Sequence, residues 1–154
     1  MQPVLYAFKQ NRKNIVSLLG EHTLGQVNTI PPGFNNNLLW NAGHLLLSHH
    51  FLFYHFSGLP MPDFVQTLGP KYGAGTIPDG KASQAEFDLI LDHLNKSTQQ
   101  LIDDYNNGRF KTYKQYTSEY FGITMQNIEE AIQFTIYHEA FHFGFMSAIK
   151  LGLR

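Results

Sequence analysis

The 154-residue chain contains no cysteine. This absence excludes a disulfide scaffold, a thiolate metal site and a cysteine nucleophile, so any metal ion must be held by His, Asp or Glu. Charged residues are also scarce, at 15% of the chain, and no run of basic residues is longer than Arg12-Lys13. Proteins that bind nucleic acids usually carry a basic stripe, so we do not expect binding to DNA or RNA.

The chain also lacks a long apolar run and a recognisable secretion signal. No run approaches the ~20 apolar residues that cross a membrane, and the first residues show no basic stretch followed by an apolar core. We therefore expect a soluble, cytoplasmic protein with no membrane partner. The length fits a single domain over residues 1–154, with an ordinary globular content of 43% hydrophobic residues.

Four long segments show the apolar spacing of amphipathic helices. They are predicted at about 3–19, from 35–37 to 57, at 83–107 and at 124–151. Ser83 is the predicted N-cap of the third segment, with Glu86 completing a capping box. No useful alternating strand pattern is present. Residues 59–81, rich in Pro and Gly, are predicted to form one long irregular crossover, a kind of loop that often has a binding role.

These features together predict the fold class. Four amphipathic helices with one long crossover loop are typical of an all-α four-helix bundle.

The most informative motif is H-E-A-F-H at residues 138–142. On a helix, His138 and His142 lie one turn and about 40° apart, so both imidazoles can reach a common metal ion. The same letters spell the zincin metalloprotease motif, which needs a further ligand downstream. The chain after His142 contains no His, Asp, Glu or Cys. The zincin interpretation therefore fails, and a third ligand must come from upstream.

Histidines in the second predicted helix are the candidates for this third ligand. Measured around the helix from His44, His49 and His50 lie more than 100° away, and we expect them at the surface or in an interface. His55 shares the stripe of His44 but lies about 16 Å further along the axis, so the two cannot bind the same ion. Spacing alone leaves His44 and His55 open.

The motif W-N-A-G-H at residues 40–44, together with H-E-A-F-H-F-G at 138–144, resembles the DinB/YfiT-like superfamily. That family pairs W-x-x-x-H on its second helix with H-x-x-x-H-x-G on its fourth. The resemblance spans the chain and implies a four-helix bundle whose metal ligands are His44, His138 and His142. It also implies a transferase or isomerase that uses a low-molecular-weight thiol. Imidazole sites suit several divalent transition metals, of which zinc or nickel is expected here.

Three neutral imidazoles leave positions open on a divalent ion, which is typical of catalytic rather than structural sites. Two reactions follow: attack by the thiolate of a small thiol on an electrophile, or hydrolysis of a small substrate by activated water. A non-catalytic, stress-associated metal-binding protein is a further alternative. The residues do not choose among a transferase, a hydrolase and this non-enzyme.

We also expect supporting roles for residues within and next to the two motifs. Glu139 is expected to hold a supporting partner or a backbone group rather than to act as a general base. Asn37 or Asn41 could orient a ligand imidazole through a hydrogen bond. Trp40 is expected in the core or in a pocket wall.

The last predicted helix carries aromatic residues on nearly every side. A helix that is apolar all round is usually buried all round. We therefore expect it to be covered by the long loop or by a second subunit, and a homodimer is predicted. The aromatic residues are Phe134, Tyr137, Phe141, Phe143 and Phe145.

Overall fold

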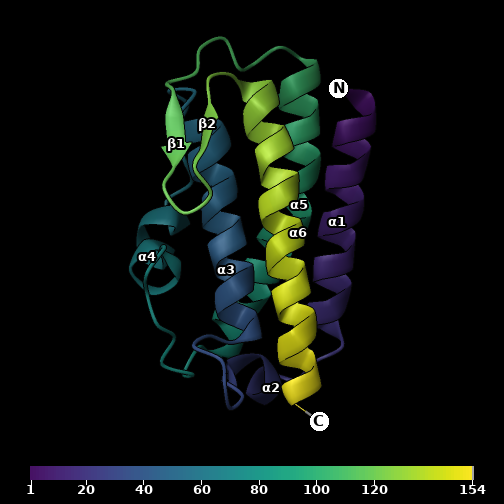
Figure 1. Ribbon diagram of the computed structural model, residues 1–154, viewed down its shortest axis with the longest axis vertical. Coiled ribbons are helices and arrows are strands. Elements are labelled where there is room, and N and C mark those ends of the chain that lie inside the picture. The colour runs from purple at the N-terminus through teal and green to yellow at the C-terminus, as the bar shows by residue number, and fades with distance from the viewer. Residues whose placement is uncertain (154) are drawn as a thin grey trace.

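A computed structural model describes residues 1–153, and four long helices run side by side through it (Figure 1). Helix α1 packs against α5 and α6, and α3 packs against the same two helices, so the four form a ring with α1 and α3 on opposite corners. The predicted all-α four-helix bundle is confirmed. The long helices are α1 (Gln2–Gly20), α3 (Leu38–His49), α5 (Gln84–Asn106) and α6 (Ile128–Gly152).

Shorter elements complete the fold. A one-turn helix, α2 (Leu24–Asn28), follows α1, and α3 continues directly into a π-helical segment, η1 (His50–His55). The predicted second helix is therefore two segments with different hydrogen-bond patterns. The change of pattern alters the direction in which the side chains after His49 point. Within the described residues, no helix combines the length and the apolar character needed to span a membrane.

Polar side chains cap the long helices where their sequences indicate. Asn37 Oδ1 accepts a hydrogen bond from the backbone N–H of Trp40 at 2.7 Å, which starts α3. Ser83 caps α5 by accepting from the backbone of Glu86. Asn127 Oδ1 accepts from the backbone N–H of Glu130 and starts α6. These bonds satisfy N–H groups that have no partner inside their own helices.

The last helix begins later than predicted. Thr124 belongs to a small antiparallel hairpin of β1 (Tyr116–Ser118) and β2 (Ile123–Met125), in which it pairs with Thr117. Strands of three residues are too short to show a period of two in the sequence. In Figure 1 the hairpin lies beside the upper part of α3, on the same side of the bundle as the crossover segment.

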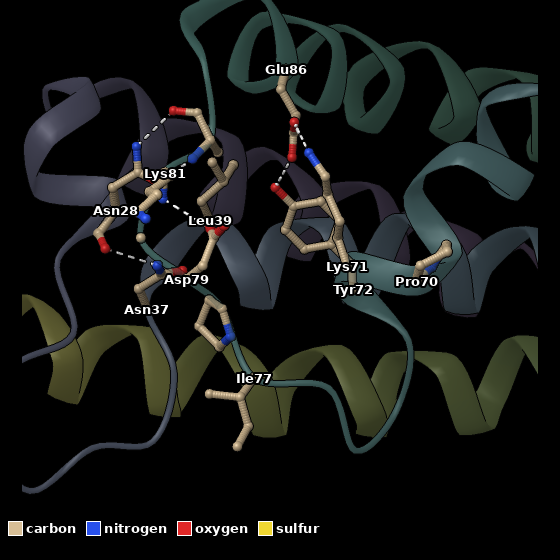
Figure 2. A pocket seen from close by; sticks show the side chains of 13 residues that line it. Asn28, Asn37, Leu39, Pro70, Lys71, Tyr72, Ile77, Asp79, Lys81 and Glu86 are labelled. Carbon is tan, nitrogen blue, oxygen red and sulfur yellow. Dashed lines mark hydrogen bonds and ion pairs between the residues drawn. The ribbon is translucent and has the colours of Figure 1, made fainter.

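The crossover at residues 59–81 is not wholly irregular, because it contains helix α4 (Phe64–Tyr72). The side chain of Glu86 does not reach back to complete the predicted capping box. Its carboxylate instead accepts hydrogen bonds from Lys71 Nζ and from the Tyr72 hydroxyl, which anchors α4 on the start of α5 (Figure 2). A small cavity of about 240 Å³ lies beside this anchor.

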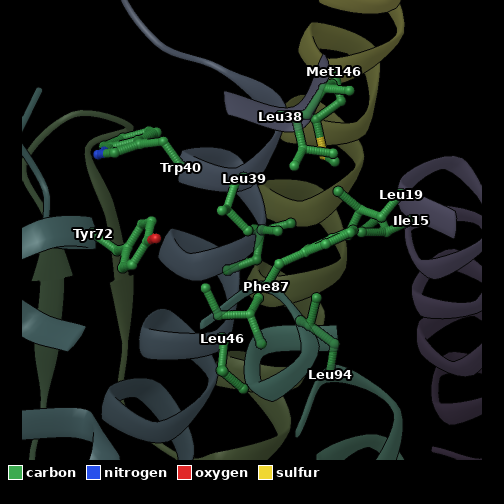
Figure 3. Close-up of a cluster of buried hydrophobic side chains, with 14 of the residues drawn as sticks. Ile15, Leu19, Leu38, Leu39, Trp40, Leu46, Tyr72, Phe87, Leu94 and Met146 are labelled. Carbon is green, nitrogen blue, oxygen red and sulfur yellow. The ribbon is translucent and has the colours of Figure 1, made fainter. Parts of the chain in front are cut away.

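The core consists of two apolar clusters stacked along the bundle. The first surrounds Leu38, Leu46 and Met146 (Figure 3), and the second surrounds Phe53 and Ile132. A buried polar residue separates the two clusters on every long helix. These residues are Arg12 of α1, His49 of α3, Thr98 of α5 and Glu139 of α6.

The expectation that His49 and His50 lie at the surface is wrong. His49 is fully buried, with its ring 6.1 Å from that of Phe8 on α1, and His50 is buried against Phe64. The physical reason is that the inward-facing stripe of α3 is not the stripe of His44. Leu38, Ala42, Leu45 and His49 follow one another at helical spacing and face the bundle interior.

Candidate metal centre

Three imidazoles converge between α3 and α6. Each of His44, His138 and His142 offers one ring nitrogen, and these nitrogens all lie within 4.8 Å of one another. The Nε2 atoms of His138 and His142 are 3.2 Å apart. Two ligands at a zinc–nitrogen distance of about 2.05 Å in a tetrahedral site lie about 3.3 Å apart. The histidine group therefore has the spacing that could hold a divalent metal ion.

Of the two candidates in the second predicted helix, the fold brings His44 to the other histidines and leaves His55 away from them. The ring centroid of His44 lies 5.3 Å from that of His138 and 5.0 Å from that of His142. His55 is exposed on η1, where it contacts Phe51 and Phe56.

Asn41 orients the imidazole of His142. Its side-chain Nδ2 donates to Asn36 Oδ1 and to the backbone carbonyl of Asn37, which turns the amide oxygen the other way. That oxygen, Oδ1, lies 2.7 Å from His142 Nδ1. Because an amide oxygen can only accept, Nδ1 carries the proton, and the lone pair of Nε2 is free for a metal ion.

The imidazole of His44 is oriented in the same way from the crossover segment. Its Nδ1 donates to the backbone carbonyl of Tyr72 at 3.0 Å, which again leaves Nε2 as the free nitrogen. The indole of Trp40 stacks on the ring, with centroids 5.0 Å apart and planes within 4°. Trp40 is thus both part of the core and part of the pocket wall, and its Nε1 donates to Thr76.

Gly43 permits this arrangement by its lack of a side chain. A Cβ atom at this position would lie 2.5 Å from the ring of Tyr72, closer than van der Waals contact permits. The glycine therefore allows α4 to approach α3, and this approach carries the Tyr72 carbonyl to His44. Gly144, in the other motif, differs because a Cβ there would meet nothing within 4 Å.

His138 is the one ligand imidazole whose Nδ1 has no hydrogen-bond partner among the described residues. Phe134 stacks on its ring at 5.8 Å, and Phe121 meets it edge-on at 5.9 Å. The Nδ1 atom of His138 is buried. Packing against aromatic rings, rather than a hydrogen bond, sets the orientation of this imidazole.

The three imidazoles are held in the neutral form that binds metals. Burial lowers the pKa of His138 to about 3, with further contributions from His44 and Arg12. Burial, together with the neighbouring histidines, also lowers the pKa of His142, and burial lowers that of His44. Near pH 7 no proton has to leave these rings before an ion can bind.

Glu139 holds a charged partner inside the bundle. Its Oε1 lies 2.6 Å from the guanidinium of Arg12 on α1, and both side chains are almost completely buried. Arg12 also donates to the backbone carbonyl of Leu45, the residue after His44, so the pair ties α1, α3 and α6 together. Burial raises the pKa of Glu139, while Arg12 opposes this rise. The carboxylate does not line the histidine cleft, which removes the basis for a zincin-like base.

A cleft of about 1130 Å³ opens from the three imidazoles to the surface. No fourth His, Asp or Glu joins the histidine group within residues 1–153. The crossover segment forms part of the wall of the cleft, as expected of a long loop. The hairpin forms another part, which was not predicted from the sequence. Lining residues beyond the histidines include Trp40, Ser48, Phe51, Gly73, Ala74, Tyr116, Glu119, Tyr120, Phe121, Phe134, Phe141 and Phe145.

The aromatic residues of α6 are not covered all round within one chain. Phe134 is buried, but Tyr137, Phe141 and Phe145 keep about half to a third of their surface exposed. Of the two expected covers, the long loop does not cover these residues, and cover by a second subunit stays a prediction. The hairpin and crossover instead leave an open side next to the cleft.

Comparison with known proteins agrees with the motif geometry. No curated protein matches the sequence. A family model described as the DinB superfamily matches residues 7–146, which include all three histidines, the whole of α3 and α5, and most of α1 and α6. The chain therefore belongs to the DinB superfamily.

Proposed function

We propose that His44, His138 and His142 hold a divalent transition metal, zinc or nickel, and that the protein is a transferase of a low-molecular-weight thiol. The observation that carries this proposal is the open side of the histidine group. Three neutral imidazoles supply the ligands, no fourth His, Asp or Glu joins them within residues 1–153, and the cleft leads outward from them. Catalytic sites keep such room, whereas structural sites are closed by protein ligands.

An ion in this position would supply Lewis acidity, which lowers the pKa of a thiol or of water that enters the open side. The protein supplies the orientation of the ligands. Asn41 and the Tyr72 carbonyl each hold an Nδ1–H group, so that the Nε2 atoms of His142 and His44 face the cleft. Ser48, which also lines the cleft, has its Oγ 3.5 Å from His44 Nε2 and is a polar group within reach of a guest there.

The setting of the carboxylates favours thiol transfer over hydrolysis, because none within residues 1–153 joins the histidine group. Hydrolytic metal sites commonly add a carboxylate that moves protons to and from the reacting atoms. Within the described residues, Glu139 is occupied by Arg12 away from the cleft, and Glu119 is exposed on the hairpin turn. A thiolate needs no such base during its attack, because its proton has already been lost.

The proposed reaction is a simple substitution. The thiol loses its proton to water, the sulfur forms a bond to an electrophilic carbon, and the leaving group departs with the electron pair of the broken bond. The aromatic side chains that line the cleft offer the thiolate few hydrogen-bond donors, which keeps it weakly solvated and reactive.

The test is a panel of small thiols with a generic electrophile, using untagged protein reconstituted with zinc or nickel. The proposal expects turnover that a chelator abolishes and that returned metal restores. His142→Ala should lose this turnover, and His55→Ala, which alters an exposed histidine outside the group, should retain it. Turnover that survives chelation would remove the metal from the reaction, and hydrolysis without any thiol would favour the hydrolase.

A further inference from the structure

The rim of the histidine cleft carries aromatic surface that the chain itself does not cover. Phe51, Phe141 and Phe145 remain 39%, 43% and 38% exposed, and Tyr120 remains 79% exposed. All four line the same cleft as the imidazoles. Exposed aromatic surface gathered around a concave site is typical of ligand binding, because covering it recovers hydrophobic free energy.

The aromatic wall is continuous from the rim to the imidazoles. The ring of Tyr120 lies 6.1 Å from Phe141, and Phe121 lies 5.5 Å from Phe141 and 5.9 Å from His138. These separations are those of rings in aromatic contact. A planar ring that enters along this wall would meet aromatic side chains on the path to His138.

The wall of the cleft also carries little charge. Among residues 1–153, the cleft is lined by no Lys or Arg, and Glu119 is its one acidic residue. An anionic guest would lose its hydration beside the phenyl rings, and no Lys or Arg of the lining would compensate this loss with an ion pair.

The dimensions favour a small molecule over a protein surface. A volume of about 1130 Å³ lies just above the range of about 300–1,000 Å³ that is usual for ligand pockets. The face of a second chain could cover Phe141 and Phe145 at the rim. It would leave empty the space that leads down to His138 and His142.

We infer that the cleft binds an aromatic substrate that carries no negative charge, stacked on the rings of the hairpin and α6. The inference rests on the proposed function, since it describes the electrophile that the thiol would attack. It follows from the juxtaposition of an uncovered aromatic wall with a lining that, among residues 1–153, contains one acidic residue and neither Lys nor Arg.

Three probes with one ring system test this inference: 2-naphthalenemethanol, 2-naphthylmethylammonium and 2-naphthoate. Their binding to the full chain is measured by titration calorimetry, first without metal and then with zinc. In the metal-free protein we expect the neutral and cationic probes to bind about tenfold or more tightly than the anion. The metal-free comparison is decisive, because a carboxylate could bind a zinc ion directly.

Matched variants locate the binding site. Phe141→Leu should weaken the neutral probe by about fivefold, because a stacked ring is lost. Tyr6→Leu, an equally conservative change on the exposed face of α1, should leave its affinity unchanged. Glu119→Lys should raise the affinity for 2-naphthoate on the order of threefold at low salt, an effect that added salt should screen.

Equal affinity for all three probes, or no binding of any, would overturn the inference. So would a stable dimer in ultracentrifugation that Phe141→Leu dissociates, because a second copy would then occupy the rim. If the probes bind in the expected order but the zinc protein transfers no thiol, the substrate class stands and the proposed function fails.

Discussion

The amide oxygen of Asn41 lies 2.7 Å from Nδ1 of His142, a hydrogen bond that joins α3 to α6 across 101 positions of sequence. It connects the two histidine motifs directly, since Asn41 stands between Trp40 and His44. The bond fixes which nitrogen of His142 faces the other imidazoles. The first motif therefore both contributes one ligand and orients another.

Asn41→Ala tests this role. Loss of such a supporting hydrogen bond typically weakens metal affinity 10–100-fold, and we expect a decrease in zinc affinity of about that size. Asn35→Ala is the control, because Asn35 lines the cleft but, among the described residues, has no hydrogen bond to a ligand imidazole. Competition with a chromogenic chelator measures both affinities. Equal affinities in the two variants would show that Asn41 does not position His142.

Substitution of the two motif glycines by alanine should change the free energy of unfolding in opposite directions. Gly43→Ala would push Tyr72 and its carbonyl away from α3, so we expect weaker zinc binding and a lower free energy of unfolding. Gly144→Ala adds a methyl group in open space on an exposed helix. It should stabilise the fold by up to about 1 kcal/mol through helix propensity and leave zinc affinity unchanged. Urea unfolding and zinc titration of both variants check this contrast.

Glu139→Gln separates a structural role from catalysis. The change leaves the buried charge of Arg12 without its partner, and loss of one member of such a pair costs about 3–5 kcal/mol of unfolding free energy. Adding Arg12→Met should restore much of that loss. Under conditions where Glu139→Gln remains folded, its turnover should stay within about threefold of the original chain. A loss of the 10²–10⁴-fold size typical of a missing general base would contradict this assignment.

The buried histidines of α3 and η1 should make the fold sensitive to acid. Burial lowers the pKa of His50 to about 4, and Arg12 and His93 act in the same direction. The unfolded chain thus takes up a proton near pH 6.5 that the folded chain does not, so stability should fall as the pH drops from about 6.5 to 4. The whole shift corresponds to on the order of 3 kcal/mol for His50.

Urea unfolding of the metal-free protein at pH 7 and pH 5 measures this effect. His50→Phe should flatten the dependence, because the titrating ring is replaced by one that stays neutral. His49 and the three histidines of the metal centre, whose pKa values burial also lowers, will continue to contribute in the variant. An unchanged difference between the two pH values would mean that His50 is not the titrating group.

The helices of the bundle could be predicted because their signals are local. Apolar spacing marks α1, α5 and α6, and Ser83 is a polar cap next to an apolar stripe. Helix α4 escaped prediction because Gly69 and Pro70 lie inside it, and both disfavour helix interiors. The hairpin escaped because its strands are only three residues long.

The histidine site was only partly predictable from helical geometry. The angles around one helix show that His138 and His142 share a face, but they do not show which end of α3 lies beside them. The resemblance to a family, not spacing, separated His44 from His55. The partner of Glu139 could not be predicted from the sequence, because Arg12 lies 127 positions away and no local pattern connects the two residues. The burial of His49 did carry a signal, because it extends the stripe of Leu38, Ala42 and Leu45.

Metal content after reconstitution tests the central claim most directly. Untagged protein is exposed to zinc, passed through a desalting column and analysed by elemental mass spectrometry alongside His142→Ala and His55→Ala. We predict one zinc ion per chain in the original protein and in His55→Ala, and almost none in His142→Ala. Retention of a full zinc ion by His142→Ala, or its loss from His55→Ala, would contradict the three-histidine site.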